Sequence, residues 1–218
     1  MANYETAFND VIKRLGECKI IPIFAFETVD DGVKVCEIID KAGLGIAEIT
    51  FRTAAASDTI RTLSKRFPNV LVGAGTILNR IDLEMAAAAG AKFAVAPGCN
   101  PSIIRAASET RLPFFPGVSN PTDIECANEL GVKVMKFFPA EACGGVKMLR
   151  AMGAPYRHLG IRFIPTGGVT ASNVMDYLSL ENVVAVGGTW LAPTELVKSK
   201  QWDKIENLVK EALAAVNT

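Results

Sequence analysis

Two ionisable side chains occur where the sequence otherwise indicates buried strands. Lys136 lies in Val134-Met-Lys-Phe-Phe138, and Glu48 lies in Ile46-Ala-Glu-Ile-Thr-Phe-Arg52. Burying such groups costs on the order of several kcal/mol unless they are paired or used. Apolar surroundings favour the neutral amine, which is the form that attacks a ketone. Lys136 is therefore a candidate nucleophile and Glu48 a candidate acid or base. The alternatives are a structural pair between Glu48 and Arg52, and a lysine that pairs or reaches solvent.

The strand around Glu48 has two different faces. Side chains alternate along a strand, so Glu48, Thr50 and Arg52 share one face with Ile46, and the other face is wholly apolar. The apolar face suits packing against helices. The other face carries an acid, a hydroxyl and a base in a row, which favours a functional site.

Two glycine pairs follow the last two predicted strands, in Pro165-Thr166-Gly167-Gly168 and Val186-Gly187-Gly188-Thr189. Glycine lets backbone N–H groups approach a phosphate, and the last two loops of a β/α barrel commonly hold one. The pairs therefore predict a phosphate site, with tight turns as the alternative. Two further residues follow predicted strands: Thr76 has a hydroxyl for a substrate carboxylate, and Pro97 shapes a pocket wall.

Short apolar runs alternate with amphipathic stretches along the chain, which is typical of repeated β/α units around a parallel sheet. The predicted strands are Ile20–Phe24, Ile46–Phe51, Val70–Ala74, Phe93–Ala96, Pro113–Pro116, Val134–Phe137, Phe163–Pro165 and Val183–Val186. The predicted helices include Tyr4–Gly16, Asp31–Ala42, Ala55–Arg66, Arg80–Ala89, Asn120–Leu130, Ser172–Leu178 and Trp202–Val216.

Eight such units predict an α/β fold, a single (β/α)8 TIM barrel with an N-terminal helix, as one domain over residues 1–218. An open doubly wound sheet is the alternative. In a barrel the active site lies at the carboxyl ends of the strands, which is where the polar residues above are found.

Composition excludes several classes of function. Lys plus Arg and Asp plus Glu number 23 each, so no excess positive charge is available for nucleic acid or an anionic membrane. No apolar run approaches the roughly 20 residues that span a bilayer, and we expect a cytoplasmic protein. Five scattered cysteines without a Cys-x-x-Cys pair and a single histidine argue against a disulfide framework and against a metal site.

The motifs together resemble the 2-keto-3-deoxy-6-phosphogluconate (KDPG) / 2-keto-4-hydroxyglutarate (KHG) aldolase family. The resemblance covers nearly the whole chain. It is carried by Glu48-Ile-Thr-Phe-Arg52-Thr, Val72-Gly-Ala-Gly-Thr76, Ala96-Pro97-Gly98, Lys136-Phe-Phe-Pro-Ala-Glu141, Pro165-Thr-Gly-Gly168 and Gly187-Gly-Thr-Trp190.

The resemblance implies roles for eleven residues. Lys136 matches the Schiff-base lysine, Glu48 the general acid/base, and Arg52 with Thr76 the groups that hold the pyruvate carboxylate. The remaining matches are the pocket residues Pro97, Phe138 and Thr166 and the phosphate-binding residues Gly167, Gly168, Gly188 and Thr189. The family usually carries serine at the position of Thr189, and some members have a basic residue after the first strand, where this chain has none.

The resemblance also implies an activity. We expect a class I aldolase that needs no cofactor or metal, forms a homotrimer and has a small keto acid as its partner. Its substrate would be KDPG, cleaved to pyruvate and glyceraldehyde 3-phosphate, or KHG, cleaved to pyruvate and glyoxylate. The alternatives are an aldolase for the phosphogalactonate epimer, a phosphosugar isomerase or epimerase, and a phosphosugar-binding protein without catalysis.

Overall fold

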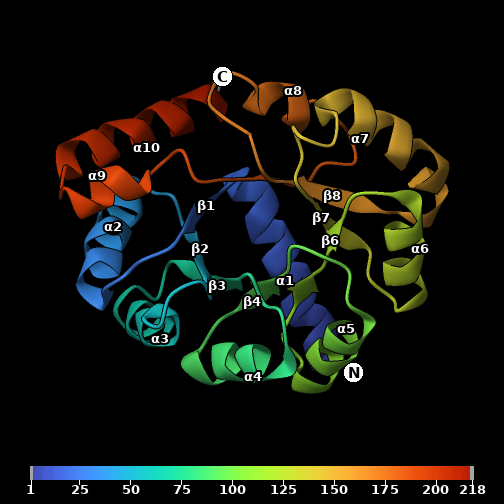
Figure 1. Cartoon of the computed structure of the whole chain (residues 1–218), viewed down its shortest axis with the longest axis horizontal. Coiled ribbons are helices and arrows are strands. Elements are labelled where there is room, and N and C mark those ends of the chain that lie inside the picture. The colour runs from blue at the N-terminus through green and yellow to red at the C-terminus, as the bar shows by residue number, and fades with distance from the viewer. Residues whose placement is uncertain (1, 217–218) are drawn as a thin grey trace.

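The structure is a computed structural model that describes residues 2–216. Its strands lie at the centre and its helices around them, as Figure 1 shows. The six-stranded sheet has the order β5-β4-β3-β2-β1-β9, and a three-stranded sheet has the order β6-β7-β8. The strands are β1 (Ile20–Phe24), β2 (Ile46–Thr50), β3 (Leu71–Gly75), β4 (Phe93–Val95), β5 (Phe114–Phe115), β6 (Gly117–Val118), β7 (Val134–Phe137), β8 (Arg162–Pro165) and β9 (Val186–Gly188).

Every strand pair in the described chain is parallel. The strands from β5 to β1 follow one another without the reversal that a doubly wound sheet has, so that alternative is wrong. The arrangement is a curled parallel α/β fold, and its ladders form two sheets where the sequence predicted one closed ring. The isolated bridge Thr166↔Gly187 connects the end of β8 to β9, and Phe163↔Val183 joins β8 to the segment just before β9. The chain passes from β5 to β6 through Pro116.

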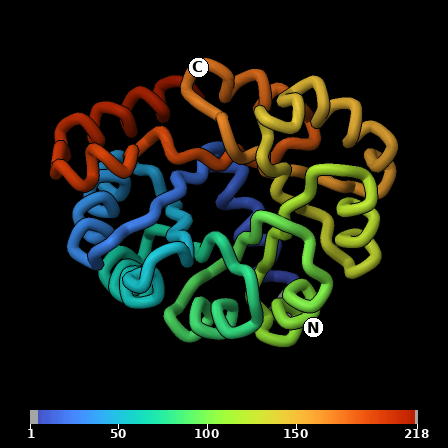
Figure 2. The backbone as a smooth tube through the Cα atoms, in the orientation of Figure 1, coloured from blue at the N-terminus to red at the C-terminus, as the bar shows by residue number. Residues whose placement is uncertain are grey.

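Most helices lie around the strands, and Figure 2 shows the backbone trace in the same orientation. They are α1 (Ala2–Cys18), α2 (Val29–Lys41), α3 (Ala56–Arg66), α4 (Arg80–Ala89), α5 (Pro101–Thr110), α6 (Pro121–Glu129), α7 (Gly145–Gly153), α8 (Val174–Leu178), α9 (Thr194–Lys198) and α10 (Trp202–Val216), with a 3₁₀ turn at Ala154–Leu159. Four of them begin after a residue whose side chain accepts a backbone N–H, which satisfies one of the free donors at a helix start: Thr28, Asn79, Asn100 and Asn120.

Helix α1 lies at the end of the strands opposite to their carboxyl ends. Its Arg14 donates from Nη2 to the carbonyl of Gly45 at 2.9 Å and to that of Asn69 at 2.7 Å, just before β2 and β3 begin. Figure 1 shows this helix crossing the strands. The carboxyl ends of the strands therefore lie away from α1.

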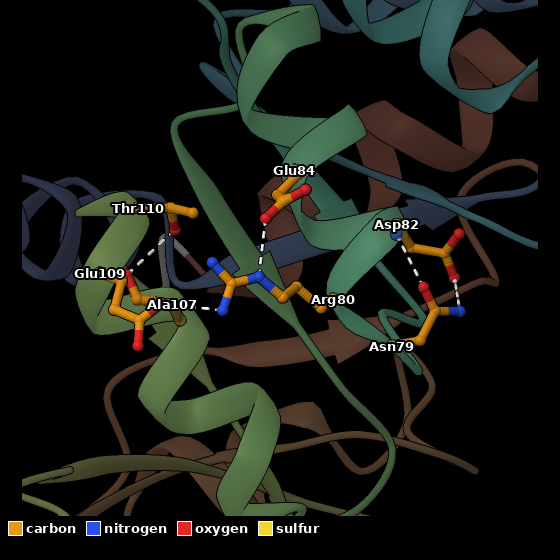
Figure 3. A network of polar contacts seen from close by, with 7 residues as sticks. All are labelled: Asn79, Arg80, Asp82, Glu84, Ala107, Glu109 and Thr110. Carbon is orange, nitrogen blue, oxygen red and sulfur yellow. Dashed lines mark hydrogen bonds and ion pairs between the residues drawn. The ribbon is translucent and has the colours of Figure 1, made fainter.

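An exposed polar network connects α4 to α5 (Figure 3). Arg80 contacts Glu84 at 2.7 Å and Glu109 at 2.9 Å, while Asn79 and Asp82 form the cap that starts α4. Exposed ion pairs contribute about 0–1 kcal/mol each, so this network adds little to the stability of the fold.

One predicted strand is misplaced. The sequence predicted Val183–Val186, whereas β9 is Val186–Gly188 and Val183 makes only an isolated bridge. Strand β6 and helices α5, α7 and α9 were not among the predicted elements. No helix within residues 2–216 is both long and apolar enough to cross a membrane.

A buried thiol gives the fold an alkaline sensitivity. Burial, with Asp40 and Glu37 nearby, raises the pKa of Cys36 from 9.0 to about 12. The folded chain then holds this proton more tightly than the unfolded chain. The contribution of this thiol to the free energy of unfolding is fully present below about pH 9. It should be lost as the pH rises towards 12, by at most roughly 1.4 kcal/mol per pH unit. In urea unfolding from pH 8 to 10.5, the stability advantage over Cys36→Ala should therefore shrink. If the free energies of unfolding of the two proteins changed in parallel with pH, this prediction would be contradicted.

Candidate functional site

One cavity of about 150 Å³ lies at the carboxyl ends of the strands. It is lined by Ile23, Glu48, Thr50, Arg52, Thr76, Pro97, Lys136, Phe138, Thr166, Gly167, Gly168, Val169, Gly188 and Thr189. All eleven residues predicted from the sequence are among them. The structure thus brings together residues from seven strands and the loops that follow them. Their individual roles remain predictions.

Lys136 and Glu48 face each other in this cavity. The distance from Lys136 Nζ to Glu48 Oε1 is 3.7 Å, and the two residues are 6% and 2% exposed. The Phe138 ring lies 5.2 Å from the same Nζ, which places the amine over an aromatic face. Glu48 Oε1 is buried and has no hydrogen-bond partner among the described residues. A carboxylate oxygen without such a partner beside a buried amine is suited to accept and return protons.

The structure argues against the Glu48–Arg52 pair as the reason for these charges. Arg52 donates from Nε to Thr50 Oγ1 at 3.1 Å, and no ion pair joins it to Glu48 within the described chain. Thr50 in turn donates to the carbonyl of Phe24 at 2.9 Å. The Arg52 side chain is thus held through Thr50 to the backbone of β1, while its terminal nitrogens remain for an anion in the cavity.

A glycine makes room for Glu48. A Cβ at Gly75 would lie 2.1 Å from Glu48 Oε1, far inside contact distance. Thr76 follows directly, with a left-handed backbone (φ 58°) that is uncommon for a β-branched residue. Such outliers gather at functional sites because the surrounding structure must hold them. The end of β3 is therefore shaped around the acid on β2.

The two predicted glycine loops both line the cavity and pack against each other. Gly167 and Gly168 have φ of +98° and +82°, which only glycine adopts readily. The backbone N–H groups of Gly168 and Val169 donate to no acceptor in the part of the chain described here. A Cβ at Gly187 would lie 2.4 Å from Thr166 Oγ1, so the second loop packs closely against the first. Free N–H groups in such a turn form an anion-binding concavity.

The chain matches the model of the KDPG and KHG aldolases over residues 11–208. The chain belongs to the KDPG and KHG aldolase family. The 2-dehydro-3-deoxy-phosphogluconate aldolase of Haemophilus influenzae is 44% identical to this family member over 203 residues, which cover 93% of this chain and 95% of the relative. The KHG/KDPG aldolase of Escherichia coli K12 is 36% identical over 213 residues, 98% of both chains.

Solved structures of the family resemble this member closely. The KDPG aldolase of Legionella pneumophila, with pyruvate captured as a covalent carbinolamine intermediate, superposes with a TM-score of 0.85 at 33% identity, covering 89% of this chain and 93% of its own. The KDPG aldolase of Zymomonas mobilis with 3-phosphoglycerate has the same TM-score at 35% identity and covers 94% of each chain.

Three residues of the cavity were outside the predicted set. Thr50 was placed on the inner face by alternation, but its bond to Arg52 depends on the fold. Ile23 and Val169 line the cavity with apolar side chains, which a sequence alone cannot distinguish from core residues. No group of three or more His, Cys, Asp or Glu side chains in the described residues is arranged as metal ligands. The expectation of a metal-free reaction remains a prediction.

Proposed function

We propose that this chain is a Schiff-base aldolase that cleaves KDPG to pyruvate and glyceraldehyde 3-phosphate. The observation that carries the proposal is the buried contact of 3.7 Å between Lys136 Nζ and Glu48 Oε1. The relative from Legionella pneumophila holds pyruvate as a carbinolamine, which requires an amine that adds to a ketone. Lys136 is the lysine that lines the cavity here.

The proposed reaction begins when the Lys136 amine, with Glu48 as proton acceptor, adds to the C2 ketone. Glu48 returns that proton to the hydroxyl of the resulting carbinolamine, which leaves as water and gives a protonated imine, and this imine draws electrons from the neighbouring bonds. Glu48 removes the C4 hydroxyl proton, the C3–C4 bond breaks, and the aldehyde leaves. Glu48 returns the proton to C3 of the enamine. Water then hydrolyses the imine, which releases pyruvate and the free amine.

The proposed binding groups line the same cavity as the reacting pair. Arg52 can clamp the substrate carboxylate in a bidentate manner, with Thr76 as a second donor, and this orients the ketone towards the amine. The loops at Gly167–Gly168 and Gly188–Thr189 would hold the phosphate at the other end. Pro97, Phe138 and Thr166 form the walls between them. Binding energy at the distant phosphate can then be used for alignment at the reacting carbon.

KHG is a second candidate substrate, because a relative that is 36% identical carries both activities in its name. It ends in a carboxylate attached to C4 and carries no phosphate, and it would give pyruvate and glyoxylate. The phosphogalactonate epimer differs from KDPG at one stereocentre, and it is the third substrate to compare.

We further propose that the two sheets together close into one (β/α)8 barrel. Two bridges support this, as does the contact of α10 with α2. The single domain, the homotrimer and the cytoplasmic location remain predictions from the sequence.

A coupled assay tests the activity directly. Lactate dehydrogenase with NADH should report pyruvate release from KDPG, and the rates with KHG and the epimer rank the substrates. An isomerase or a binding protein would release no pyruvate from any of the three. That result would overturn the proposal.

Gly75→Ala should lower kcat by roughly 10²-fold, because the new methyl group must displace Glu48, and displacements of about 1 Å can have such effects. The same coupled assay measures it, and thermal melting verifies the fold. Gly16→Ala is the matched control, since its Cβ would meet only the Val184 carbonyl at 3.9 Å. Full activity in Gly75→Ala would mean that the position of Glu48 does not matter.

A further inference from the structure

The loop at Gly167–Gly168 is supported from behind by a side chain that does not line the cavity. A Cβ at Gly168 would lie 2.6 Å from both Cβ and Cγ of Glu141. The Glu141 side chain therefore packs directly on the Cα of Gly168. Its backbone N–H also donates to the carbonyl of Gly167 at 3.0 Å. Glu141 thus contacts the loop with both its backbone and its side chain.

Tyr177 fixes that side chain. Tyr177 is a fully buried residue of α8, and its hydroxyl donates to Glu141 Oε1. Burial and the neighbouring carboxylate raise the pKa of Tyr177 well above its usual range, so the hydroxyl keeps its proton and remains a donor at neutral pH. Because the buried ring has little conformational freedom, the hydrogen bond from its hydroxyl holds the Glu141 carboxylate in one position.

The same loop is held at other points. Ala140 N–H donates to the Thr166 carbonyl at 2.8 Å, and Asn173 Nδ2 donates to the Gly168 carbonyl at 3.2 Å. With Asn173 bonded to the Gly168 carbonyl and Glu141 packed on the Gly168 Cα, the turn has little freedom to tilt. Its orientation decides where the free N–H groups of Gly168 and Val169 point.

We propose that Glu141 and Tyr177 are positioning residues for the phosphate end of the substrate. The inference rests on the proposed function. Neither residue lines the cavity, so they act through the glycine turn and not by contact with substrate. Their effect is therefore confined to ligands that carry a phosphate. The imine chemistry at Lys136 and the cleavage of KHG do not depend on them.

The test compares two tyrosine variants on two substrates. Tyr177→Phe keeps the ring and removes the hydroxyl, and it should raise the KM for KDPG roughly tenfold, the usual size for a lost bond to a charged group. Its kcat and the kinetics with KHG should stay within about twofold. Tyr156→Phe is the matched control, because Tyr156 donates to Glu125 at 2.8 Å outside the cavity and should leave both substrates unchanged.

Variants of Glu141 give a graded series. Glu141→Gln keeps an acceptor for Tyr177 and the packing on Gly168, so it should behave close to wild type. Glu141→Ala keeps the Cβ contact but removes the acceptor for Tyr177 and the Cγ contact with Gly168, and it should raise the KM for KDPG at least as much as Tyr177→Phe. Glu141 is an exposed residue, so these variants should still fold.

Binding of inorganic phosphate gives a readout without turnover. In a titration followed by the amide NMR signals of Gly167 and Gly168, Tyr177→Phe should weaken the affinity severalfold and Tyr156→Phe should not. Equal losses on KDPG and KHG, or unchanged KM and phosphate affinity in Tyr177→Phe, would overturn the inference. Failure of the proposed function would give a different result, because the wild-type protein would form no pyruvate adduct. The phosphate titration would still decide whether Glu141 and Tyr177 position the phosphate site.

Discussion

Incubation with pyruvate and borohydride should add a reduced pyruvyl group to Lys136, and mass spectrometry of the digested protein should locate it there. Lys136→Ala should lose the adduct and at least about 10⁴-fold of the cleavage rate, because loss of a covalent nucleophile costs on the order of 10⁴ to 10⁶ in kcat. The physical reason is that the imine supplies the electron sink for C3–C4 cleavage, and among the described residues no other amine lines the cavity.

Two further variants separate chemistry from folding. Removing one partner of a buried pair leaves Glu48 uncompensated and can cost roughly 3–5 kcal/mol of stability. Lys136→Arg keeps a cation beside Glu48 but cannot form an imine, so it should stay folded and inactive. Lys133→Ala is the positive control, since Lys133 is exposed and bonds Asn128 at 2.7 Å. A pyruvate adduct elsewhere, with activity intact in Lys136→Ala, would reject the mechanism.

Glu48→Gln should still form the imine but turn over about 10² to 10⁴ times more slowly, which is the usual contribution of a general acid or base. The amide has nearly the same shape as the acid and fits the space left by Gly75. It cannot accept the C4 hydroxyl proton or return it to the enamine. Rapid-quench trapping measures the imine, and the coupled assay measures the turnover.

Deuterium exchange at the pyruvate methyl group gives a second measurement of Glu48. This exchange requires protonation and deprotonation of the enamine without any aldehyde. It should slow in Glu48→Gln to a similar degree as cleavage. Unchanged exchange with slow cleavage would restrict Glu48 to the C4 hydroxyl, and full turnover would remove it from the mechanism.

Much of the fold could be read from the alternation of apolar runs and helical patterns. β1 and β7 were predicted with the observed bounds, because both are apolar runs with clear flanks, interrupted in β7 only by Lys136. β9 was placed too early because glycine has low strand propensity, yet Gly187 and Gly188 pair with Ile21 and Pro22 of β1. Pro116 lies between β5 and β6, and because proline is a poor strand residue the sequence did not predict β6. In both cases pairing with a distant strand overrides the local preference.

The candidate site was predictable where charge and burial conflict. Lys136 and Glu48 stand out because few ionisable groups lie on strands with apolar neighbours on both sides. The support of the site could not be predicted in this way. The space that Gly75 leaves for Glu48, and the contact of Tyr177 with Glu141, join residues that are far apart in the sequence. Only the folded chain brings them together.

The pairing of β1 with β9 has a consequence for biosynthesis. About three quarters of the described chain separates these strands in sequence, and β1 lies between β2 and β9 in the sheet. At roughly 5–20 residues per second, a ribosome would release β1 on the order of ten seconds before its second neighbour emerges. During that time one apolar strand edge remains open to other nascent chains, and open edges invite aggregation. Slow growth at low temperature or added chaperones should therefore increase the yield of active enzyme more than stronger transcription does.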